Sequence, residues 1–141
     1  IRKTFKSGLN ARQSLKNIVN ALEKEGYVYT PSMDRGTQYS DLMIELGNSD
    51  KFGFTIDMHA TGNTSVGDVT SGPSIAPWRV GRAHLIVEQN YIFALEFEIN
   101  AWIPEWGRRI SISFEDNAIV TNNGVEYLYP PHEKIILITK E

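Results

Sequence analysis

The sequence contains no cysteine, and this absence removes several kinds of chemistry. Structural disulfides, thiolate nucleophiles and metal sites with cysteine ligands are all excluded. The chain also lacks any apolar run close to the roughly 20 residues that a membrane-spanning helix needs. Its formal net charge is -3, so it offers no general attraction for a polyanion such as a nucleic acid.

Short catalytic motifs are missing as well. No serine stands in a nucleophile elbow, and neither a dinucleotide fingerprint nor a His-Glu-x-x-His pair occurs. Residues 1–7 lack the apolar core of a secretory signal, and the chain begins with Ile1, which indicates a trimmed or excised polypeptide. We expect a soluble, cytoplasmic protein that uses no cofactor and does not contact a membrane.

The composition that is present is typical of a folded globular protein. The chain has 141 residues, of which 41% are hydrophobic and 22% charged, so we expect one domain over residues 1–141. The charges are unevenly distributed, with basic residues near the N-terminus and acidic residues in the later half. The basic set is Arg2, Lys3, Lys6, Arg12 and Lys16, and the acidic set is Glu88, Glu96, Glu98, Glu105, Glu115, Asp116 and Glu126.

The sequence predicts an amphipathic helix over residues 11–25. Asn10 and Gln13 have the spacing of a capping box, in which each side chain bonds the other residue's backbone amide. Gly26 follows at the position where a left-handed residue ends a helix. Leu15, Ile18, Val19 and Leu22 then fall on one apolar stripe.

Most of the remaining chain has the alternation of half-buried strands. We predict strands at residues 41–46, 52–59, 109–115, 118–122, 125–129 and 134–139, and a loop over residues 61–77. Asn123-Gly124 is predicted to be the turn of a tight hairpin. The fold class is therefore α+β: one N-terminal helix packed on a mostly antiparallel, strongly twisted sheet of about six to eight strands.

A long hairpin over residues 78–103 is predicted to organise this sheet. A two-residue loop would mix charged and apolar side chains on one face, whereas a loop of Glu88, Gln89 and Asn90 separates them. The second register pairs Val87 with Tyr91, Leu85 with Phe93 and Ala83 with Leu95. It also places Arg82 opposite Glu96 on the polar face.

The polar face of the predicted sheet carries the candidate chemistry. Neighbouring strands would bring together Asp57, His59, Arg82, His84, Glu96, Glu98, Arg109 and Ser111. His59, His84, Glu96 and Arg82 could serve metal-independent phosphodiester cleavage, because imidazole and carboxylate transfer protons and a guanidinium stabilises the charged transition state. A second interpretation is that these polar residues only solvate the exposed side of the sheet. A third is a metal site formed by His59, His84 and a carboxylate, but no local spacing of ligands supports it.

A second candidate surface lies at the end of the predicted hairpin. Trp102 and Trp106 flank Pro104, and Glu98 and Glu105 lie close in sequence. Exposed tryptophans are enriched at binding hot spots. We therefore expect a non-enzymatic protein-binding or inhibitory module, similar in action to an immunity protein, whose partner is another protein. The alternative is a small hydrolase of the ribonuclease-like toxin type. We expect a nucleic-acid partner only under this alternative.

Overall fold

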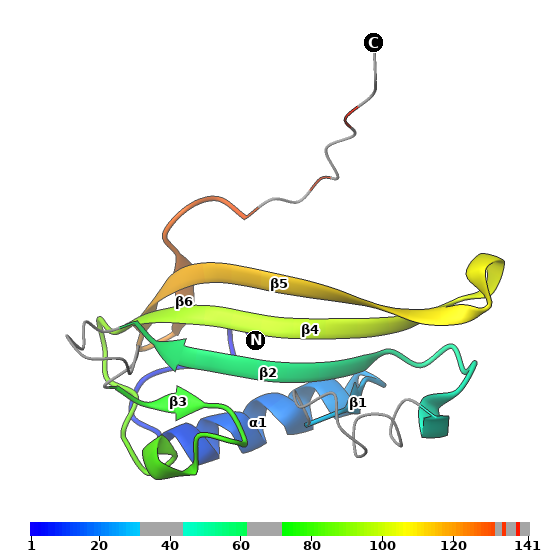
Figure 1. The fold of residues 1–141 in the computed structure, drawn as a ribbon. Coiled ribbons are helices and arrows are strands. Elements are labelled where there is room, and N and C mark those ends of the chain that lie inside the picture. Colours follow the sequence, from blue (N-terminus) through cyan, green and yellow to red (C-terminus); the bar gives the residue numbers. More distant parts are fainter. Residues whose placement is uncertain (32–43, 62–71, 132–133, 135–137, 139–141) are drawn as a thin grey trace.

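The computed structural model describes residues 1–31, 44–61, 72–131, 134 and 138. It has one α-helix, α1 (Ala11–Lys24), and a sheet in the order β1-β2-β4-β5-β6, with β3 paired to β2 (Figure 1). The strands are β1 (Val28–Tyr29), β2 (Gly53–Ala60), β3 (Ser74–Ile75), β4 (Ile92–Ile103), β5 (Arg108–Thr121) and β6 (Gly124–Tyr127). Because β1 runs parallel to β2 and the other pairs are antiparallel, the sheet is mixed. The α+β class is confirmed.

The predicted start and end of the helix are confirmed. The Asn10 side chain accepts from the Gln13 amide at 2.8 Å, and the Asn10 amide donates to the Gln13 side chain at 3.2 Å. Gly26 has a φ of 93°, which a residue with a side chain adopts at a cost. Ile18 is completely buried and belongs to one core cluster with sheet residues such as Phe54 and Leu95.

The register of the three longest strands separates two faces. Phe54, Ile56 and Met58 of β2 lie opposite Ile99, Phe97 and Leu95 of β4, so their side chains share the apolar face. The residues between them form the other face, called here the polar face. On the three strands it comprises Thr55, Asp57, His59, Glu96, Glu98, Asn100, Trp102, Arg109, Ser111, Ser113 and Glu115.

The predicted hairpin over residues 78–103 is wrong. Its second arm is the strand β4, but β4 pairs with β2 and β5. The first arm includes a 3-10 turn, η1 (Val80–Arg82), and then runs beside the start of α1. There the carbonyls of Ala83 and Leu85 accept hydrogen bonds from the amides of Arg12 and Ala11 at 2.9 and 3.0 Å. The first amides of a helix lack partners within the helix, so this segment satisfies them.

The failure of that hairpin also removes the predicted pair of Arg82 and Glu96. Glu96 lies opposite Asp57 on one side and Glu115 on the other, and Arg82 is in η1. The left-handed backbone expected at Asn90 is confirmed by a φ of 69°. The actual long hairpin joins β4 to β5 through a second 3-10 turn, η2 (Pro104–Trp106).

Other predicted strands need correction. Residues 109–115 and 118–121 belong to the single strand β5, and residues 44–46 are helical, whereas residues 41–43 lie outside the described residues. The turn before β6 is at residues 122–123, one position earlier than predicted, because Thr121 pairs with Gly124. Of residues 134–139, the structure describes only 134 and 138. Ile138 is 91% exposed, which contradicts a well-covered strand at that residue.

β3 was not predicted, because it lies inside the segment 61–77 that was expected to be a loop. Among the described residues, no helix is long and apolar enough to cross a membrane.

Candidate functional site

An ion pair that the sequence did not predict lies at the β3 side of the polar face. Arg79 donates from Nη2 to Asp57 Oδ2 at 3.0 Å, and its Nη1 contacts Asp57 Oδ1. Nη1 also donates to Ser74 Oγ at 3.3 Å. Burial raises the pKa of the Asp57 carboxyl, and the nearby Arg79 charge opposes this rise. The guanidinium therefore compensates a carboxylate that the fold has removed from water.

A second pair joins β2 to β4. His59 Nε2 lies 2.8 Å from Glu96 Oε1, and His59 Nδ1 lies 3.4 Å from the Ala60 carbonyl oxygen. The His59 side chain is only 12% exposed, and that of Glu96 is 29% exposed. A histidine held by a carboxylate is the arrangement that general-base catalysis uses. It is equally a way to satisfy two polar side chains on a covered part of a sheet.

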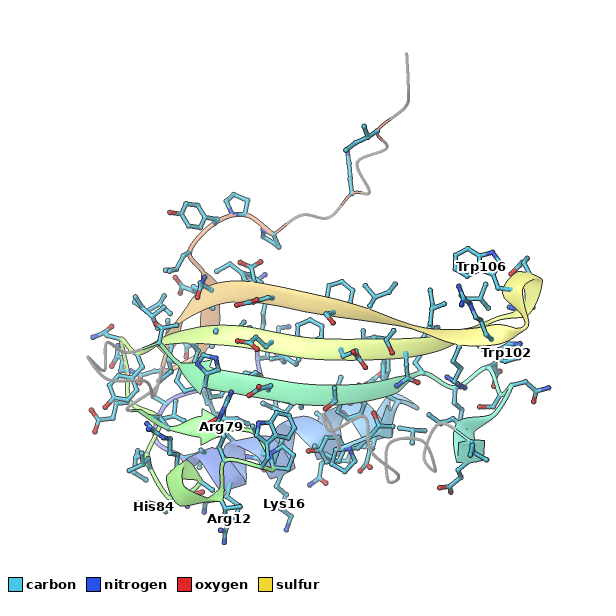
Figure 2. All side chains as sticks on the ribbon, viewed as in Figure 1. Arg12, Lys16, Arg79, His84, Trp102 and Trp106 are labelled. Carbon is cyan, nitrogen blue, oxygen red and sulfur yellow. The ribbon has the colours of Figure 1, made fainter. Side chains whose placement is uncertain are left out.

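The predicted catalytic set is only partly assembled. His59 and Glu96 are in contact, but Arg82 and His84 belong to the η1 region rather than to a strand. Figure 2 shows exposed His84 close to the Arg12 end of α1. No local pattern in the sequence indicates Arg79, because Asp57 was expected on an exposed face and its burial, which calls for a nearby cation, is a property of the folded structure.

The predicted binding residues lie toward the other end of the molecule. Trp102 and Trp106 occupy the far end of the β4–β5 hairpin, well away from His84 (Figure 2). Trp106 is 62% exposed, and the Arg108 guanidinium lies 5.6 Å from the centre of its ring. Glu105 is exposed beside Trp106 in η2, and Trp102 is half-buried on the polar face. We call Trp102, Glu105 and Trp106 the tryptophan corner.

Glu98 connects the tryptophan corner to the rest of the polar face. It lies on β4 between Thr55 of β2 and Ser113 of β5, and its side chain is partly exposed. One step further along the face, Asp57, Glu96 and Glu115 stand in register on the three strands. Asp57 and Glu96 of this row contact Arg79 and His59, and Glu115 is exposed.

Arg109, another predicted member of the polar face, is committed to the backbone. Its guanidinium donates to the carbonyl oxygens of Gly47, Ser49 and Lys51 at 2.8, 2.8 and 2.9 Å, and to Asn100 Oδ1 at 3.2 Å. A planar guanidinium with several donors suits this role better than an ammonium group does. Arg109 therefore fixes residues 47–51 against the end of the sheet.

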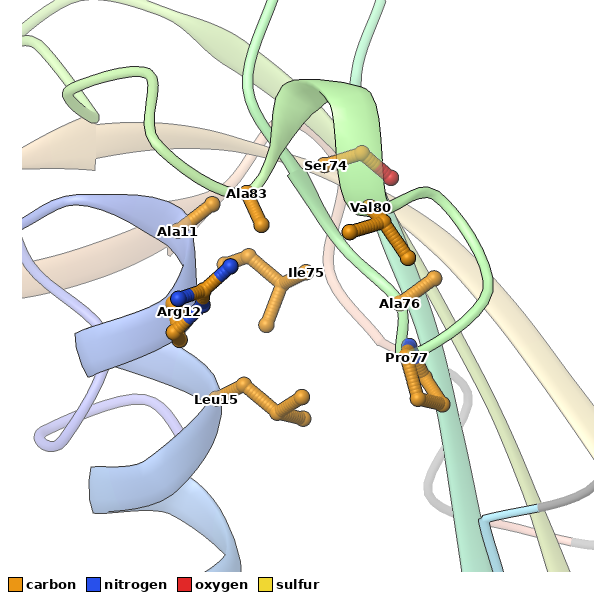
Figure 3. A pocket seen from close by; sticks show the side chains of 9 residues that line it. All are labelled: Ala11, Arg12, Leu15, Ser74, Ile75, Ala76, Pro77, Val80 and Ala83. Atoms are coloured by element: carbon orange, nitrogen blue, oxygen red, sulfur yellow. The ribbon is translucent and has the colours of Figure 1, made fainter.

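Small cavities lie outside the polar face. One cavity of about 90 Å³ lies between α1 and the chain around η1, and its lining is mostly apolar (Figure 3). Arg12 and Ser74 are the polar residues among its lining side chains, which are Ala11, Arg12, Leu15, Ser74, Ile75, Ala76, Pro77, Val80 and Ala83. A second cavity of about 90 Å³, between Leu22, Tyr27 and the apolar face, has an apolar lining. Within the described part of the chain, no group of acidic and histidine side chains could hold a metal ion.

No family model matches this sequence, and no curated protein matches it. The structure is similar to aminopeptidase P from Escherichia coli, with 18% identity, a TM-score of 0.38 and coverage of 90% of this chain and 27% of that chain. Proline aminopeptidase P II from Yersinia pestis gives 18% identity, a TM-score of 0.39 and coverage of 90% and 28%. The chain thus spans little more than a quarter of the length of these proteins.

Proposed function

We propose that this protein is a non-enzymatic binding module of the inhibitory, immunity-protein type, which recognises a basic partner protein. The tryptophan corner is the observation that carries the proposal. Trp106 is 62% exposed at the tip of a long hairpin, and the acidic side chain of Glu105 stands beside it. An exposed aromatic anchor of this kind supplies much of the binding energy in protein interfaces.

The acidic row on the polar face supports a basic partner. Arg79 compensates Asp57 and His59 contacts Glu96, but Glu115 is exposed at the outer strand. Glu98 extends the acidic character toward the tryptophan corner. Complementary charge of this kind speeds association and selects the partner more than it adds affinity.

The two cavities described above are smaller than typical sites for small molecules. Sites for small molecules usually enclose about 300 to 1,000 Å³ and combine apolar walls with several converging polar groups. Each of these two cavities holds about 90 Å³, and neither is lined by His59 or Glu96. A charged face with an exposed aromatic edge is typical of a macromolecular interface.

The experiment uses the full chain as bait, in wild-type form and with Trp106→Ala. The matched control is Trp78→Ala, because Trp78 is also partly exposed, at 39%, but lies near η1. We expect one basic protein to be retained by the wild type and the control, lost with Trp106→Ala, and released by added salt. Equal retention by all three chains would contradict the role of the tryptophan corner.

One observation supports a second candidate function. The 2.8 Å contact between His59 and Glu96 fits a general base in a metal-independent hydrolase of the ribonuclease-like type. In this alternative, RNA cleavage falls sharply with His59→Ala or Glu96→Gln, and further loss with His84→Ala or Arg82→Ala would place those residues in the site. Undiminished RNA cleavage by the double variant His59→Ala and His84→Ala would contradict the alternative.

The proposal also includes the packing of α1 on the sheet and the cellular compartment of the protein. We place α1 as the layer that covers the apolar face of a strongly twisted sheet, which the complete burial of Ile18 in the core cluster supports. We place the protein in the cytoplasm, and its proposed binding role requires no cofactor.

A further inference from the structure

The outer edge of β5 is left open by the strands that the structure describes. β6 lies beside residues 118–121 only, and the ladder continues to a bond from the Leu128 amide to the Asn117 carbonyl at 3.0 Å. The next bond in this register would need an amide hydrogen from Pro130 to reach Glu115, and proline has none. Figure 1 shows β5 at the edge of the sheet, with β6 beside one end of it.

The backbone of this edge is oriented for pairing. Peptide groups in an antiparallel strand point alternately to the two sides. The Asn117 carbonyl points outward to Leu128, so alternate residues before it, including Ser113 and Glu115, direct their amide and carbonyl groups to the same outer side. Long strand edges of this kind are templates for pairing with another chain.

The sequence of this edge is complementary to its own reverse. Residues 108–116 read Arg-Arg-Ile-Ser-Ile-Ser-Phe-Glu-Asp, with basic residues at one end and acidic residues at the other. We propose that two copies of this chain pair antiparallel through β5, with a two-fold axis at Ile112. The cross-strand pairs are then Arg108 with Asp116, Arg109 with Glu115, Ile110 with Phe114, Ser111 with Ser113, and Ile112 with Ile112 of the second copy.

Among the described strands, β4 alone pairs with residues 108–117 of β5, and the bounds of this stretch fix the same register. It is bounded by η2 and Gly107 at one end and by the β6 ladder at the other. An antiparallel pair centred on Ile112 fills this stretch in both copies. A shift by two residues would place Ile110 opposite Asp116, or Arg108 opposite Phe114, and would lose the match of charge and apolarity.

Pairing also covers apolar side chains that the single chain exposes. Ile112 is 50% and Phe114 is 43% exposed on the apolar face, and Phe114 stacks on Phe97 with 5.1 Å between the ring centres. A two-fold axis perpendicular to the sheet keeps both apolar faces on the same side, so the two strips join. Since the Arg109 side chain already bonds residues 47–51, the ionic match depends mainly on Arg108 and Asp116.

A cross-linking experiment tests the position of the axis. The chain has no cysteine, so Ile112→Cys can form a disulfide only between copies. At the axis the two residues form a non-hydrogen-bonded pair with Cα atoms about 4.5 Å apart, which a disulfide can bridge. The control is Phe114→Cys, because Phe114 is similarly exposed on the same face but would lie roughly 13 Å along the strand from its equivalent.

We expect mild oxidation to link the Ile112→Cys chain into a dimer and to leave the Phe114→Cys chain monomeric. Equal dimer formation by both variants would overturn the proposal. Dimer formation by neither variant would also overturn it, as would be found if this edge pairs with a different protein.

A charge exchange gives a second test that does not depend on oxidation. Arg108→Asp or Asp116→Arg alone should weaken the dimer, measured by sedimentation equilibrium of the full chain, by about three- to tenfold. The double variant should restore wild-type association, because the two residues are distant within one chain and adjacent only between copies. A wild-type chain that stays monomeric, or a double variant that is weaker than both single variants, would contradict the pairing. This inference does not depend on the tryptophan corner, so either proposal can fail alone.

Discussion

Replacing Arg109 by lysine should destabilise the protein strongly, although it preserves the charge. The guanidinium donates to three backbone carbonyls of residues 47–51 and to the Asn100 side chain, at 2.8 to 3.2 Å. A lysine ammonium is a point charge on a flexible stem and cannot reach several acceptors that surround a planar fork. Residues 47–51 would then lose most of their connection to β5.

The expected magnitude follows from the bonds lost. A hydrogen bond to a charged group contributes about 1.5 to 3 kcal/mol net, and Arg109→Lys loses at least two. Partial exposure of the site and non-additivity reduce the sum, so we expect a loss of about 2 to 4 kcal/mol. This is a large fraction of the roughly 5 to 15 kcal/mol that stabilises a domain.

Urea denaturation followed by circular dichroism measures this loss, with Arg108→Lys as the matched control. Arg108 is the neighbouring residue on the same strand and is exposed, and its guanidinium lies over the Trp106 ring. Its replacement should cost less than about 1 kcal/mol. Equal, small losses for the two variants would show that the bonds of Arg109 do not hold residues 47–51.

Three further predictions concern the core, the buried carboxylate and a close contact. Ile18→Ala should cost about 2 to 5 kcal/mol in chemical denaturation, and a loss below about 1 kcal/mol would argue against a docked α1. Burial raises the pKa of Asp57 in the folded chain above its ordinary value of 3.8, so Asp57 keeps its proton to a higher pH than in the unfolded chain. The free energy of unfolding, relative to that of Asp57→Asn, should therefore fall as the pH rises from 3.8 through the raised pKa. A rise over the same pH range would mean that the Arg79 charge outweighs burial. Gly53→Ala should lower stability by about 1 to 3 kcal/mol, because the added methyl would meet the Asn100 amide, and an unchanged denaturation midpoint would refute that contact.

Local signals in the sequence predicted the elements that depend on neighbours along the chain. The capping box of Asn10 and Gln13 located the helix, and the alternation around Phe54 and Ile56 located β2. The expectation that β2 is only half-buried is wrong, because Thr55 and Asp57 on its other side are also buried. Both patterns are set by backbone geometry over a few residues, so the rest of the fold changes them little.

Strand partners could not be read in the same way. The alternation of Ala83, Leu85 and Val87 resembles a strand, but their carbonyls serve the amides at the start of α1 and the preceding Gly8. β4 pairs with β2, which lies far earlier in the chain, and with β5, to which the turn η2 connects it. Alternation of apolar and polar residues predicts that one side of a segment is buried, but it does not predict which element packs against that side.

The candidate site shows the same limit. His59 and Glu96 were both proposed from the polar pattern, and the cross-strand register brings them together. The contact of Arg79 with Asp57 requires the turn between β3 and η1, and the sequence predicted this region partly as a loop and partly as a strand.

The most direct test of the proposed function is the amount of partner protein retained by the Trp106→Ala chain relative to the Trp78→Ala chain, each verified as folded. We predict that Trp78→Ala retains the partner as the wild type does and that Trp106→Ala loses it. Equal retention by both, or RNA cleavage that disappears with His59→Ala, would contradict a binding module that acts through its tryptophan corner.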